Sequence, residues 1–103
     1  MFVDVTEGNQ SFTWAASQII STTSDLNTFM TALFGGKLLP SDVLENMFTV
    51  PEVPTWNKDG KDVGRATLSM GMIRTTIKSV TFWGKIGARP GYCNGMFATR
   101  GLQ

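Results

Sequence analysis

Two repeating patterns of apolar residues divide this chain, a helical one in the first half and a strand-like one in the second. Apolar side chains recur at three- and four-residue spacing, as on one face of a helix, at Leu26, Phe29, Met30, Leu33 and Phe34. Thr22 and Asp25 precede this stripe at capping-box spacing, and Gly35-Gly36 follows it with the freedom for a left-handed C-cap. A second apolar face over residues 42 to 48, with Ser41 or Asp42 as N-cap, predicts a short second helix. We therefore expect a helical region over residues 21 to 50.

From Arg65 onward the period changes to two, which is typical of strands. In residues 80 to 86 one face is apolar, whereas the other carries Trp83 and Lys85. A turn over residues 87 to 91 leads into a further strand over residues 92 to 99. The pattern predicts antiparallel strands over residues 65 to 101.

Two stretches show neither period. Residues 1 to 20 mix Gly8 and Asn9 with aromatic residues such as Trp14, and we expect an irregular loop that its aromatic side chains hold against the core. Residues 51 to 64 hold prolines and a polar run, and we expect a surface loop without regular structure. Two helices followed by an antiparallel meander make an α+β fold, in a single domain because 103 residues are too few for two.

The composition excludes several kinds of chemistry. The chain has no histidine, so it cannot form a Ser-His-Asp or Cys-His catalytic arrangement or a zinc site that contains histidine. Cys93 is the only cysteine, and we expect a small buried residue without chemistry of its own. We expect no metal and no cofactor. The chain shows neither a signal peptide nor a membrane span, so as written it is expected to stay in the cytoplasm.

The charges are unevenly distributed along the chain. Residues 1 to 57 contain six acidic residues against Lys37, whereas residues 58 to 103 contain eight basic residues against Asp59 and Asp62. A basic second half is typical of an anion-binding face, but solvated strands and turns give the same count. Nucleic acid is not an expected partner, because the basic residues are scattered singly and the aromatic residues near them are equally suited to a core.

Two segments resemble the serine penicillin-recognising family, which contains class C β-lactamases, DD-carboxypeptidases and related esterases. The first segment is AASQIISTTSDLNTF at residues 15 to 29, continued by GGKLL at residues 35 to 39. The second is WGKIGARPGY at residues 83 to 92, which is similar to the third active-site box of that family and the turn after it. The resemblance extends over roughly residues 10 to 101 and implies a partial β-lactamase/transpeptidase-like fold.

The resemblance implies a role for three residues of the second segment. Lys85 would provide a cation for a substrate carboxylate, Gly87 would let the substrate approach the strand, and the N–H of Ala88 would contribute to an oxyanion hole. Ile86 departs from the family, which has a hydroxyl residue there that hydrogen-bonds the substrate. The loss of such a contact weakens binding by about 1–3 kcal/mol where it is buried.

The family performs acyl transfer with a serine, a lysine three residues after it, and a tyrosine or serine from a second box. No serine here is followed by lysine at that spacing, and Tyr92 matches the turn rather than a Tyr-x-Asn box. We therefore expect no catalytic residue in this chain. It is interpreted as an inactive fragment of a β-lactamase-like or D-alanyl-D-alanine carboxypeptidase-like hydrolase, a family that is usually periplasmic or extracellular, with a D-Ala-D-Ala peptide or a β-lactam as the implied ligand.

A second hypothesis is a small non-catalytic α+β binding module that holds an anionic peptide or a protein partner with its basic half. Under either hypothesis the strand over residues 92 to 99 contains no proline or carboxylate to prevent pairing between chains. We therefore expect a homodimer formed through the late strands, or a sheet that is locally loose.

Overall fold

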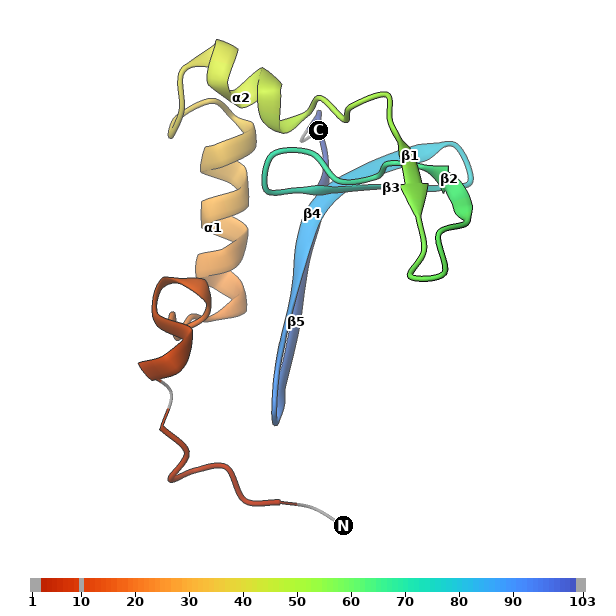
Figure 1. Ribbon diagram of the computed structural model, residues 1–103. Coiled ribbons are helices and arrows are strands. Elements are labelled where there is room, and N and C mark those ends of the chain that lie inside the picture. The colour runs from red at the N-terminus through yellow and green to blue at the C-terminus, as the bar shows by residue number, and fades with distance from the viewer. Residues whose placement is uncertain (1–2, 10, 102–103) are drawn as a thin grey trace.

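The computed structural model describes residues 3–9 and 11–101 and has the α+β architecture that the sequence predicts (Figure 1). In chain order the elements are the 3₁₀ helix η1 (Ser11–Ala16), the helices α1 (Thr23–Phe34) and α2 (Ser41–Met47), and the strands β1 (Pro54–Trp56), β2 (Asp62–Arg65), β3 (Ile73–Ile77), β4 (Val80–Arg89) and β5 (Tyr92–Thr99). β1 and β2 form a two-stranded antiparallel sheet, and the other strands form an antiparallel sheet in the order β3-β4-β5.

Helix α1 has the caps that its sequence predicts. The Thr22 hydroxyl accepts a hydrogen bond from the Asp25 N–H at 3.1 Å and donates one to the Asp25 carboxylate at 2.9 Å. At the other end Gly36 has a φ of +70°, and the Lys37 N–H donates to the Ala32 carbonyl at 2.9 Å. This six-to-one bond across a left-handed glycine is the Schellman C-cap, so both ends of the predicted helix are confirmed.

Helix α2 is confirmed, but its predicted N-cap is wrong. Pro40, rather than Ser41 or Asp42, occupies the N-cap, and no side chain caps the helix. The Pro40 carbonyl accepts the Leu44 N–H at 2.9 Å. The proline ring fixes φ at −55° at this N-cap, and the helix begins at Ser41, one or two residues earlier than the pattern predicts.

The core lies between the two helices and one face of the three-stranded sheet. Its buried members are Met30, Leu33, Phe34, Phe48, Met72 and Trp83. The Phe48 ring meets Phe34 and Trp83 edge-on, with centroids 5.1 and 5.3 Å away. The Arg100 guanidinium lies 4.6 Å from the centre of the Phe48 ring and also pairs with Glu45. Phe48 therefore joins both helices to the sheet.

The sheet packs against the helices with its aromatic face. Trp83 lies opposite Ala98, and both belong to the core, as does Met96 opposite Lys85. We call this the inner face. The alternating apolar residues predicted on β4 lie on the other face, where Val80 is 44% and Ile86 60% exposed. The large Trp83 indole decides the orientation because it buries more apolar surface than these aliphatic chains do.

Residues 51 to 64 lie at the surface, but the prediction of no regular structure there is wrong. β1 and β2 form a small exposed hairpin. In its turn the Asn57 side-chain oxygen accepts the N–H groups of Asp59 and Lys61, at 3.0 and 2.9 Å. These local bonds stabilise a hairpin that has no apolar alternation to predict it.

Two further segments also differ from the pattern. Residues 66 to 72, expected as a strand, form a connection with one isolated bridge between Leu68 and Ile73. Residues 11 to 16 form η1, and Trp14 in it is not held against the core, since it is 79% exposed; Ile19, just after η1, is 91% exposed, and the Phe12 side chain lies outside the described part. Of the loop predicted over residues 1 to 20, residues 1, 2 and 10 lie outside the described part.

Candidate functional site

Part of β4 has an open edge, and this segment contains the residues that the sequence singles out. β3 pairs with β4 only from Val80 to Gly84, whereas β5 pairs with β4 from Phe82 to Arg89. Within the described part of the chain, residues 85 to 89 therefore have a strand neighbour on one side only; we call them the open β4 segment. Figure 1 shows β4 and β5 continuing together beyond β3 as a two-stranded ribbon. Such an edge can receive an extended chain by backbone pairing.

The register fixes which backbone groups point to the open edge. Two-residue turns close the pairs Ile77–Val80 and Arg89–Tyr92, and the two residues of such a closing pair hydrogen-bond to each other. Even-numbered residues of β4 therefore direct their N–H and C=O groups toward β3. Odd-numbered residues of β4 direct theirs toward β5. Beyond Gly84, where β3 has ended, the even-numbered residues direct these groups to the open edge. The Ala88 N–H therefore lies at this edge.

The side chains of the candidate residues divide between the two faces. Lys85 and Gly87 lie on the inner face, with Lys85 exposed and Gly87 half-buried. Ile86 and Ala88 lie on the opposite face, which we call the outer face. A Cβ at Gly87 would come within 3.0 Å of the Asn94 side-chain amide, so Asn94 already lies against this glycine. The structure thus brings Lys85, Gly87 and Asn94 together, whereas Ala88 reaches the edge through its backbone alone.

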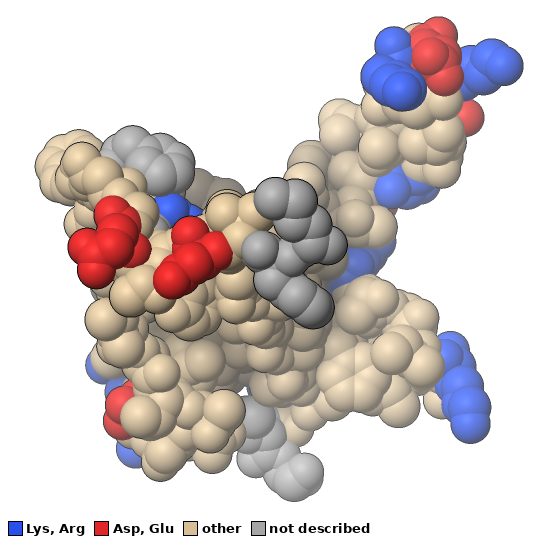
Figure 2. Space-filling view, turned by 90° about the horizontal axis from the view of Figure 1, so that it is seen from below, with Lys and Arg blue, Asp and Glu red and all other residues tan. Residues whose placement is uncertain are grey.

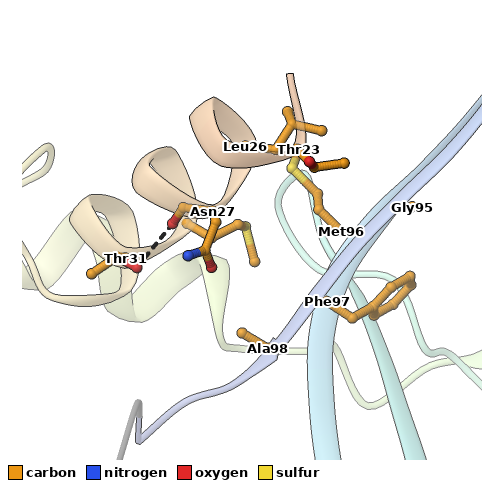
Figure 3. Close-up of a pocket in the computed structure, with 9 residues that line it drawn as sticks. Thr23, Leu26, Asn27, Thr31, Gly95, Met96, Phe97 and Ala98 are labelled. Carbon is orange, nitrogen blue, oxygen red and sulfur yellow. Dashed lines mark hydrogen bonds between the residues drawn. The ribbon is translucent and has the colours of Figure 1, made fainter. Parts of the chain in front are cut away.

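A groove of about 220 Å³ separates α1 from β5 and adjoins this site (Figure 3). It is lined by Thr23, Leu26, Asn27, Met30, Thr31, Gly95, Met96, Phe97 and Ala98. Figure 3 shows the Asn27 side chain on the β5 side of α1 and Met96 extending from β5 toward the helix. Met96 is also the strand partner of Lys85. The sequence pattern does not predict Asn27 or Asn94 at this site, because neither residue interrupts a periodic pattern.

The far end of β4 is fastened to the N-terminal segment. The Arg89 guanidinium donates hydrogen bonds to the hydroxyls of Thr13 and Ser17, the latter at 3.2 Å. In the same segment the pKa of Asp4 is lowered by hydrogen bonds from the Thr6 hydroxyl and the Thr6 N–H. Arg89 therefore stabilises the ribbon and is already occupied by protein partners.

Charge at the surface follows the division seen in the sequence without forming one basic patch. Figure 2 shows Lys and Arg side chains mainly on two projecting arms, with acidic side chains on the body and at the tip of one arm.

Cys93 is exposed on the outer face opposite Ala88, so the expectation of a buried thiol is wrong. It is exposed because β5 is an edge strand and no described helix or strand packs across that face.

No described helix is long and apolar enough to cross a membrane. The described ranges also contain no group of three or more Cys, Asp or Glu residues that could hold a metal ion.

Comparisons with known proteins do not name a family. No protein-family model matches the chain, and no solved structure matches it either. A functional assignment therefore rests on the motifs and on the geometry of the open β4 segment.

Proposed function

We propose that this chain is part of a β-lactamase-like or D-alanyl-D-alanine carboxypeptidase-like serine hydrolase that keeps a ligand-binding strand without the nucleophile. One observation carries the proposal: the pairing of β3 with β4 stops at Gly84, where the motif that resembles the third active-site box begins. Lys85, Gly87 and Ala88 therefore lie in a segment of β4 that has no β3 partner, and Ala88 directs its N–H to the open edge.

Each of these residues has a chemical role toward an acyl-D-Ala-D-Ala peptide. The exposed Lys85 ammonium attracts the terminal carboxylate, and a charge-assisted hydrogen bond of this kind is stronger than a neutral one. Gly87 has no Cβ, and a ligand can approach the strand closely there once the Asn94 side-chain amide, which lies against this glycine, moves aside. The Ala88 N–H donates to a ligand carbonyl oxygen, as an oxyanion-hole donor does.

Binding is expected without turnover. Acyl transfer requires an activated nucleophile, and no serine of this chain is followed three residues later by a lysine. A hydrogen-bond donor at the carbonyl oxygen cannot replace the attacking group. The pure chain should therefore leave both a β-lactam and a D-Ala-D-Ala peptide intact.

The test is a titration of the ¹⁵N-labelled chain with an N-acyl-D-Ala-D-Ala peptide, followed by NMR. We expect saturable shifts centred on residues 85 to 88 and a dissociation constant that Lys85→Ala raises about tenfold, which corresponds to about 1.4 kcal/mol. Lys78→Ala is the matched control, because it removes the same charge from the β3–β4 turn at the opposite end of β4. The L-Ala-L-Ala peptide tests stereochemical preference.

Three results would contradict the proposal. Hydrolysis of nitrocefin by the pure chain would show that a nucleophile is present after all. Equal increases of the dissociation constant in Lys85→Ala and Lys78→Ala would show that the peptide is attracted by positive charge in general and not by Lys85 in particular. Saturable binding of an acidic peptide at residues outside 85 to 88, with none of the D-Ala-D-Ala peptide, would instead support the small binding module.

A further inference from the structure

The outer face of the three-stranded sheet is uncharged over its whole extent. It consists of the odd-numbered residues from 73 to 77, the even-numbered residues from 80 to 88 and the odd-numbered residues from 93 to 99, as the strand register requires. None of these residues is Lys, Arg, Asp or Glu. The inner face, by contrast, carries Arg74, Lys85 and Arg89.

This uncharged face is open to solvent in part, since Ile73, Thr75 and Phe82 on it are half-buried. Ile77 and Ile86 are each 60% exposed, and Phe97 is 39% exposed. The Phe97 ring lies across Gly84 on the neighbouring strand, so close that a Cβ there would come within 2.7 Å of it. The result is an apolar surface at the middle of the face. Contiguous apolar surface of this kind is typical of an interaction site in a folded protein.

The solvent-accessible area of the whole chain is larger than that expected for a compact monomer of its mass. It is 8495 Å² for 11.3 kDa, whereas a folded monomer of that mass exposes about 5,700 Å². The radius of gyration is 16.4 Å, against about 13 Å for a compact chain of this length. A specific interface takes about 800 Å² from each partner. The surplus, which is spread over the whole chain, exceeds the area that one such interface takes.

We propose that a second copy of this chain covers the outer face, so that two sheets stack into an isologous dimer. The outer face of one copy can pack against the outer face of another because neither face carries a charged residue. Stacking therefore buries no charge and places no like charges next to each other. Stacked sheets pack about 10 Å apart, a distance that the Ile86 and Phe97 side chains of both copies would fill. The proposal is independent of the ligand site, which uses the inner face and the open edge of β4.

The test measures molar mass by light scattering over a range of concentrations for the full chain and two variants. Ile86→Glu puts a carboxylate on the outer face and is expected to weaken the dimer by roughly a hundredfold or more, since like charges meet in the interface. Tyr92→Glu is the matched control, because Tyr92 is 74% exposed on the inner face of the same ribbon. This control should dimerise as the parent does.

Cys93 provides a second measurement that needs no variant. Its thiol is exposed on the outer face in the single chain, so its reaction with a maleimide should slow as concentration rises and the dimer forms. A monomer at all concentrations would overturn the proposal. So would a dimer in which Cys93 stays reactive and Ile86→Glu has no effect, a result that would indicate pairing through the β5 edge. Circular dichroism verifies that each variant is folded.

Discussion

Single residues set the geometry of the two turns that connect the strands of the three-stranded sheet. The β4–β5 turn uses Gly91 at a φ of +83°, a conformation that costs glycine nothing. The β3–β4 turn uses Lys78 at a φ of +57°, where the Cβ of an L-residue meets the neighbouring backbone. The shorter hairpin therefore contains local strain that the longer one avoids.

Lys78→Gly is expected to stabilise the chain by about 0.5–1 kcal/mol, because glycine adopts this backbone conformation without the Cβ contact. Urea unfolding would measure the change as a higher transition midpoint with an unchanged slope. Ser79→Gly, at the next position, where φ is not positive, should give no gain. A lower midpoint for Lys78→Gly would show that Lys78 is not strained in solution.

At the scale of elements, α1 is defined by its own sequence, whereas the sheet is defined by unequal strand lengths. The helix has both caps and a stripe whose Met30, Leu33 and Phe34 are buried. β3 has five residues and β4 has ten. This difference, which no periodic pattern reveals, creates the open β4 segment.

Thr22→Ala is expected to destabilise the chain by about 1 kcal/mol, because the Asp25 N–H then loses its hydroxyl acceptor at the start of α1. Thermal unfolding would detect the loss, and amide exchange should accelerate first at Asp25. Thr28→Ala serves as control, since that hydroxyl donates to the Ser24 carbonyl within the helix and caps no N–H group. Equal losses for both variants would indicate that capping is not the cause.

At the scale of the whole molecule, a small core holds the helices to the sheet, and Phe48 lies at its centre. Phe48→Ala is expected to cost about 3–5 kcal/mol and to abolish cooperative unfolding, because domains of this size have little stability to lose. The near-ultraviolet dichroism of the buried Trp83 should disappear. Phe29→Ala is the control, since Phe29 is 44% exposed and outside the core. A cooperative transition in Phe48→Ala would mean that contacts other than those of Phe48 hold the helices to the sheet.

The sequence alone determined the features that depend on local chemistry. The caps of α1 follow from Thr22 and Gly36, and the α+β order follows from the change of period near Arg65. These features are predictable because the interacting groups are close together along the chain. The family assignment, the roles of Lys85, Gly87 and Ala88 and the homodimer remain predictions for the experiments above.

Only the tertiary structure decided which face of the sheet is buried. The alternation in β4 offers an apolar face and a face with Trp83, and it gives no information on which one meets the helices. The contact of Trp83 with Phe48 settles that choice, and it leaves Ile86 and Cys93 in solvent. The end of β3 likewise decides that Ala88 lies at an open edge. Both results depend on groups far apart in sequence, because packing and strand pairing are set by the partner that arrives from elsewhere in the chain.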